Sequence, residues 1–85
     1  MVTGQMKMVL DYVKERDNAI HSGDFEKFKR FQDKWQKKGI LPAVSSEDVL
    51  RISFYKLMYN VPGTPPEKKK EAEEWLTSHN YGLKL

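Results

Sequence analysis

The chain has 85 residues and no cysteine, so it has the length of one domain and can form neither a disulfide framework nor a thiolate metal site. No apolar run approaches the roughly 20 residues that a membrane span needs, and no basic and then apolar signal pattern opens the sequence, so we expect a cytoplasmic protein with a single domain over residues 1–85. Lys and Arg number 15 against 12 Asp and Glu, and this excess lies in residues 25–38, where six bases meet two acids.

The first predicted helix covers about residues 5–21. Its apolar residues recur at helical spacing, which predicts one buried face: Met6, Val9, Leu10, Val13 and Ile20. Gly23 follows the last turn and can adopt the left-handed conformation that ends a helix.

The second predicted helix covers about residues 25–38, with Asp24 as its N-cap. Its aromatic residues step by three, three and four and predict a buried stripe: Phe25, Phe28, Phe31 and Trp35. Gly39 stands where a helix-ending glycine is expected, with Ile40 placed to fold back on Trp35, and Pro42 prevents continuation.

The third predicted helix covers about residues 46–60. Ser45 is the expected N-cap, with Asp48 three residues on and Val44 able to contact Val49. One face of this helix is apolar and is expected to be buried: Leu50, Phe54, Leu57, Met58 and Val61.

The fourth predicted helix covers about residues 65–79. Thr64 is the expected N-cap, with Pro65 at the first helical position and Glu67 completing a capping box. The helix is expected to bury Ala72, Trp75 and Leu76 and to end at Asn80. Short loops between amphipathic helices, and no sustained alternation typical of strands, predict an all-α fold: a small antiparallel bundle of about four helices.

No pattern typical of a catalytic, cofactor or metal site is present. The five glycines are scattered at helix boundaries, so none forms a phosphate-binding loop. Neither His21 nor His79 has a second histidine one turn away, and both are predicted to lie at helix C-termini. The acidic residues near the N-terminus interleave with bases and indicate a solvated face. The sequence therefore predicts a protein that is not an enzyme and has no cofactor.

A cationic row on the second helix is the first candidate binding feature. Its members lie about one turn apart, opposite the aromatic stripe: Lys27, Arg30, Lys34 and Lys37. Such a row can contact the phosphates of a nucleic acid, and the turn before it allows a helix-turn-helix interpretation. The alternative is a solvated basic face, or one that meets an acidic protein, because Glu26 and Asp33 stand at helical pair spacing from Arg30 and Lys37.

An aromatic edge on the third helix is the second candidate. Tyr55 and Tyr59 project at i, i+4 away from the buried stripe, together with Ile52. A helix that is apolar on two sides is either central in the bundle or exposes a patch for a partner or a second copy.

The order of short motifs resembles a group of small proteins encoded by phages, prophages and other mobile elements of Gram-positive bacteria. The similar stretches are residues 14–20 (KERDNAI), 24–27 (DFEK) and 74–76 (EWL), with Gly39 and Pro42 between them. An acidic helix start at residues 47–49, Lys56 and a Pro-rich break also keep that order. The chain differs from the group at Leu50-Arg51 and Tyr55-Lys56, where the group has Phe-Trp and His-Lys pairs. The resemblance implies an accessory gene of a mobile element and no particular chemistry.

Two functions agree with these features. The first is a non-enzymatic accessory protein that binds and modulates a host or phage protein through the cationic row and the Tyr55/Tyr59 edge, with Arg and Tyr as energetic anchors. The alternative is a small nucleic-acid-binding protein that contacts phosphates through the same row. A homodimer is compatible with either.

Overall fold

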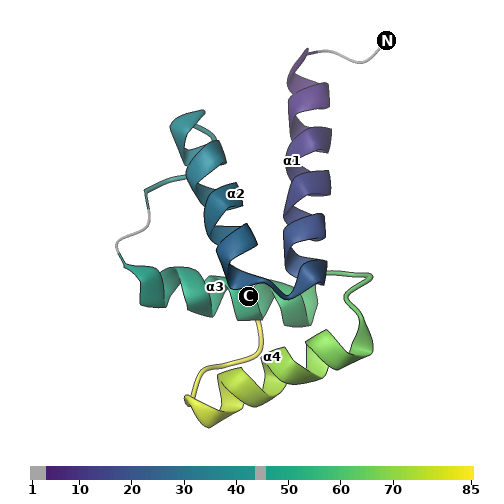
Figure 1. The fold of residues 1–85 in the computed structure, drawn as a ribbon, viewed down its shortest axis with the longest axis vertical. Coiled ribbons are helices and arrows are strands. Elements are labelled where there is room, and N and C mark those ends of the chain that lie inside the picture. Colours follow the sequence, from purple (N-terminus) through teal and green to yellow (C-terminus); the bar gives the residue numbers. More distant parts are fainter. Residues whose placement is uncertain (1–3, 44–45) are drawn as a thin grey trace.

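The computed structural model describes residues 4–43 and 46–85, and these residues form four helices and no strand. α1 spans Gly4–Ser22, α2 Phe25–Lys37, α3 Glu47–Asn60 and α4 Pro66–Ser78. α1 and α2 form one antiparallel hairpin, and α3 and α4 form a second hairpin that crosses the foot of the first (Figure 1). The predicted all-α bundle is confirmed, in the form of two crossed helical hairpins.

α3 is the central helix of the core. One side of α3 packs along α4, while the other contacts α1 and α2. The predicted stripe of α3 is buried at Leu50, Phe54, Met58 and Val61, and the stripe of α2 at Phe28, Phe31 and Trp35. α3 is therefore apolar on two sides because the chain itself covers both.

The ends of α2 form as the sequence predicts. The Asp24 side chain accepts hydrogen bonds from the backbone N–H groups of Glu26 and Lys27, at 3.0 and 3.4 Å. Gly39 has a φ of 78°, and the Ile40 N–H donates to the Trp35 carbonyl at 3.0 Å, as in a Schellman motif. Ile40 itself is exposed, and Leu41 is the partly buried side chain that packs against the core.

The predicted N-caps of α3 and α4 were each wrong by one residue. Ser46 caps α3, where its hydroxyl accepts from the Val49 N–H at 3.2 Å; Val44 and Ser45 lie outside the described residues. α4 begins at Pro66 after Pro65, and the Thr64 hydroxyl instead donates to the Val61 carbonyl. Pro65 has a φ of −55° and a ψ of 140° because the proline that follows it disfavours the helical conformation, so the helix starts one residue later, at Pro66.

The apolar face of α1 is buried only in its second half. Ala19 and Ile20 are in the core, but the exposed fractions are 53% for Met6 and 60% for both Val9 and Leu10. α1 has 19 residues against 13 in α2, and Tyr12 already packs against Trp35 in the last turns of α2. The first turns of α1 therefore extend beyond the hairpin partner, and the prediction that they are buried was wrong.

The two hairpins meet at the turn between α1 and α2. Gly23 has a φ of 68°, and the side chain of Lys68 from α4 runs where a Cβ would stand, with its carbons 2.7–2.8 Å from that position. The Nε2 atom of His21 lies 3.2 Å from the carbonyl oxygen of Pro62 in the α3–α4 loop. These contacts join the α1–α2 turn to the second hairpin.

Candidate functional site

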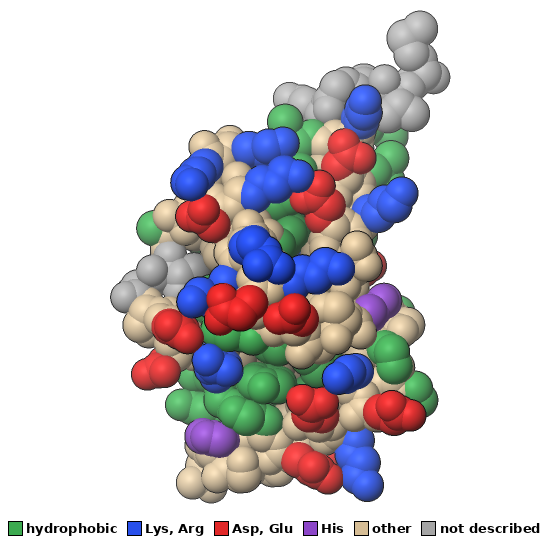
Figure 2. All heavy atoms as spheres, viewed as in Figure 1, with side chains coloured by type: hydrophobic (Ala, Val, Ile, Leu, Met, Phe, Trp, Pro, Cys, Tyr) green, Lys and Arg blue, Asp and Glu red, His purple; other side chains and the backbone are tan. Residues whose placement is uncertain are grey.

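The cationic row of α2 lies on the outer side of the molecule. Arg30, Lys34 and Lys37 are exposed and Lys27 is half-buried, while the aromatic stripe points inward as predicted. Figure 2 shows that basic and acidic side chains intermingle over α1 and α2 on this face. The row is thus accessible, but it is not a surface of one sign.

Half of the cationic row is neutralised by carboxylates of the same chain. Lys34 Nζ lies 2.6 Å from Glu15 Oε1 on α1, and Lys37 Nζ lies 3.0 Å from Asp33 Oδ2. Among the described residues, Lys27 and Arg30 are the two members of the row that join no ion pair. Two free cations remain for a partner.

Glu15 joins α1 to α2 through both of its carboxylate oxygens. One oxygen accepts from Lys34, and the other accepts from the indole Nε1 of buried Trp35 at 2.6 Å. These hydrogen bonds, that of Lys34 first and that of Trp35 second, hold the pKa of the Glu15 carboxyl below its ordinary value. Lys38 also places its ammonium 4.7 Å from the Trp35 ring centroid.

We expect Glu15→Gln to lower the free energy of unfolding by about 1 kcal/mol at neutral pH, since solvent screens this half-exposed pair. The lowered pKa stabilises the fold above the ordinary pKa of glutamate, and this contribution is lost as the pH falls through the folded-state pKa. Urea titrations between neutral and acidic pH should therefore show a flatter pH dependence for Glu15→Gln. Glu73→Gln, which removes an exposed carboxylate of the fourth helix that joins no ion pair among the described residues, serves as control and should keep the wild-type stability at neutral pH. Equal slopes for Glu15→Gln and the wild type would contradict the pairing.

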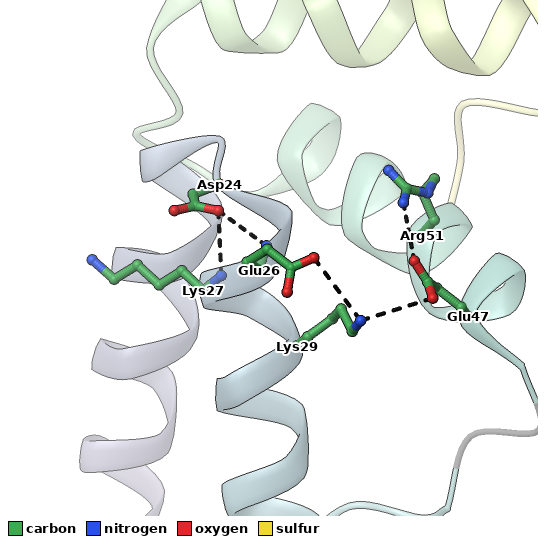
Figure 3. A network of polar contacts seen from close by, with 6 residues as sticks. All are labelled: Asp24, Glu26, Lys27, Lys29, Glu47 and Arg51. Carbon is green, nitrogen blue, oxygen red and sulfur yellow. Dashed lines mark hydrogen bonds and ion pairs between the residues drawn. The ribbon is translucent and has the colours of Figure 1, made fainter.

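A polar network connects α2 to the first turn of α3 (Figure 3). Lys29 Nζ lies 3.9 Å from Glu26 and 3.8 Å from Glu47, and Arg51 binds Glu47 at 3.2 Å. The network borders a hollow of about 480 Å³ between the two helices. Its charges compensate one another, so it is better suited to fixing α2 against α3 than to holding a charged ligand.

The Tyr55/Tyr59 edge faces α4 and is not a free edge. The Tyr55 ring stacks on Trp75 with centroids 4.4 Å apart, and Lys69 Nζ lies 5.2 Å from the Tyr59 centroid. Both tyrosines are half-buried. The structure therefore brings neither of them together with the cationic row, and α4 accounts for the second apolar side of α3.

An aromatic pocket at the C-terminal end of α4 was not predicted from the sequence. Trp75, His79 and Tyr81 form a stack in which Trp75 and His79 are 4.3 Å apart, and Tyr81 is parallel to His79 within 3°. They line a hollow of about 420 Å³, together with three residues of α3: Asp48, Arg51 and Ile52. We call these six residues the aromatic pocket.

Part of the aromatic pocket could have been predicted from the spacing of its residues. Trp75 and His79 are four residues apart, so their rings lie on one side of α4, and His79 Nδ1 is 2.7 Å from the Trp75 carbonyl, as expected for a histidine at a helix C-terminus. Asn80 has a φ of 61° and turns the chain so that Tyr81 folds back on Trp75. The approach of Asp48 depends on how the helices cross, which the sequence pattern does not contain.

An exposed apolar strip on the first turns of α1 is the other surface that the sequence did not identify. Val9 and Leu10 are each 60% exposed, and Met6 and half-buried Val13 continue the strip on the same side of the helix. We call these four residues the α1 strip. They occupy positions i, i+3, i+4 and i+7 of one helix, so the strip is continuous.

Compared with known proteins, the chain matches no family model, no curated protein and no solved structure. Within residues 4–43 and 46–85, no group of three His, Cys, Asp or Glu side chains is arranged to hold a metal ion. None of the described helices combines the length and apolarity that crossing a membrane requires. The candidate surfaces are therefore the cationic row, the aromatic pocket and the α1 strip.

Proposed function

We propose that this protein is a non-enzymatic module that binds another protein through the α1 strip. The main support for this proposal is the exposure of Val9 and Leu10, two large apolar side chains that the hairpin leaves accessible to solvent. Contiguous exposed apolar side chains are typical of protein-binding surfaces. The resemblance to proteins of phages and mobile elements supports a host or phage protein as the partner.

The spacing of the α1 strip supports a specific mode of binding. An amphipathic helix that docks into a groove presents anchors at i, i+3, i+4 and i+7, as the strip does. Lys7 and Lys14 are exposed and lie one turn to either side of Leu10 on the same helix, with one exposed acid, Asp11, between these two bases. The proposed partner surface is therefore an apolar groove with an acidic rim.

The cationic row supports the same partner rather than a nucleic acid. Phosphate binding requires several cations that are free to release counterions, and Lys34 and Lys37 are already paired to Glu15 and Asp33. Lys27 and Arg30 remain as a second contact with an acidic surface. Nucleic-acid binding stays the competing function for the experiment to decide.

We expect Leu10→Asp to abolish the capture of partner proteins from a lysate of the cells that carry the gene, because a charge at the centre of the strip cannot enter an apolar groove. The matched control is Asn18→Asp, which adds the same charge at an exposed position on another side of α1. Capture by the two variants and the wild type is compared by quantitative mass spectrometry, with circular dichroism to show that all three are equally folded.

Nucleic-acid binding, the competing function, is tested with the wild type and one further variant. Lys27→Ala/Arg30→Ala should reduce partner capture severalfold at most, and the wild type should bind duplex DNA no more tightly than a protein of similar charge at 50 mM salt. If Leu10→Asp captured the same partner proteins as the wild type, the proposed function would be contradicted. Tight, salt-sensitive DNA binding that Lys27→Ala/Arg30→Ala removes would replace it with the nucleic-acid function.

A further inference from the structure

The aromatic pocket lies on α3 and α4, away from the α1 strip, and combines stacked rings with one uncompensated carboxylate. On the face shown in Figure 2, hydrophobic surface gathers over α3 and α4, with acidic and basic side chains beside it. We propose that this pocket binds the guanidinium group of an arginine side chain from a partner protein. The proposal does not depend on the function assigned to the α1 strip.

The charge of the pocket favours a cation. Two charged side chains line it, Asp48 and Arg51. The Arg51 guanidinium is engaged elsewhere, since it binds Glu47 at 3.2 Å and lies 4.1 Å from the Phe25 ring centroid. Asp48 joins no ion pair among the described residues, so its carboxylate is available to a cationic ligand.

The rings favour a planar cation. The Trp75 ring stacks with Tyr55, at a centroid distance of 4.4 Å, and also with His79 and Tyr81, so the four rings form one stacked cluster. Tyr81 is 40% exposed and His79 is exposed, so faces of the stack are open to a ligand. A guanidinium stacks on aromatic faces and forms paired hydrogen bonds with a carboxylate, whereas an ammonium does neither as well.

The volume of the pocket agrees with a single side chain. The hollow of about 420 Å³ is open to solvent and accommodates an arginine side chain, whose stem would contact Ile52. A nucleotide would bring its phosphates towards Asp48 and Glu47, which disfavours it. The nucleotide is therefore the competing ligand in the experiment.

The test is a titration of the whole chain with three blocked tripeptides, Ac-Gly-Xaa-Gly-NH₂, with arginine, lysine or citrulline in the middle. The indole signal of Trp75 in ¹H–¹⁵N NMR spectra reports on the pocket, and that of buried Trp35 is the internal control. We expect saturable shifts of the Trp75 signal with the arginine peptide, and about tenfold weaker binding of the citrulline peptide, which keeps the planar shape without the charge.

Two variants test the contributions of the carboxylate and of the rings to binding separately. Asp48→Asn should weaken the arginine peptide about tenfold, whereas Asp33→Asn on α2 should not change its binding. Tyr81→Leu removes an exposed ring outside the helices and should also weaken binding. Equal binding of the arginine and citrulline peptides, unchanged binding by Asp48→Asn, or tighter binding of adenosine monophosphate at the same signals would overturn the proposal.

Discussion

Replacing Phe54 by alanine should remove about 3–5 kcal/mol from the free energy of unfolding, the largest loss expected from any single ring of α3. Phe54 is 1% exposed, and its ring centroid lies 5.5 Å from that of Phe25, 5.2 Å from Phe28 and 5.1 Å from Tyr55. It stands where α3 meets α2, so no single helix can move to fill the cavity. A domain of this size has a total stability of roughly 4–13 kcal/mol, so Phe54→Ala should unfold at a clearly lower urea concentration than the wild type.

Urea titrations followed by circular dichroism measure this loss. Ser53→Ala is the matched control because Ser53 is the exposed neighbour of Phe54 on α3, and it should change the stability by less than about 0.5 kcal/mol. A loss below 1 kcal/mol for Phe54→Ala would show that α3 does not pack against the first hairpin as described.

Replacing Trp35 by alanine should have a similar effect, about 3–5 kcal/mol, for a partly different reason. Trp35 is 1% exposed and meets Tyr12 edge to face at 5.4 Å, so the substitution leaves a large cavity between α1 and α2. The substitution also removes the indole N–H that donates a hydrogen bond to the Glu15 carboxylate. The first hairpin should therefore lose both its packing and its polar contact.

The two contributions of Trp35 can be separated with Trp35→Phe. This variant keeps most of the buried ring and loses the hydrogen bond, so we expect a smaller loss of about 1–2 kcal/mol. The exposed neighbour Gln36→Ala is the control and should be neutral. If Trp35→Ala and Gln36→Ala had the same stability, the inward orientation of the aromatic stripe would be wrong.

The elements of the fold could be predicted from the sequence because their local signals are strong. Asp24 and Gly39 bound a helix whose aromatic residues recur on one side, and that stripe is buried. Two helix starts were misplaced by one residue where neighbours compete for the cap. Ser45 and Ser46 have the same chemistry, and Pro65 is kept out of the helical conformation by the proline that follows it.

The surfaces could be predicted only in part, because a periodic pattern does not say which partner covers a face. The α1 strip has the same spacing as a core stripe, yet α2 ends before it can cover Val9 and Leu10. The Tyr55/Tyr59 edge had the spacing of a binding patch, yet α4 covers it. In both cases, whether the apolar face is covered depends on helix lengths and on the crossing of the hairpins.

The most direct test of the proposed function is photo-crosslinking from position 10. A benzophenone amino acid replaces Leu10 in one protein and Asn18 in another, and both are irradiated in the same lysate. We expect a discrete crosslinked partner from position 10 and at least tenfold less of that product from position 18, because only the first lies in the α1 strip. Equal yields from the two positions would show that α1 binds nothing through its exposed apolar side chains.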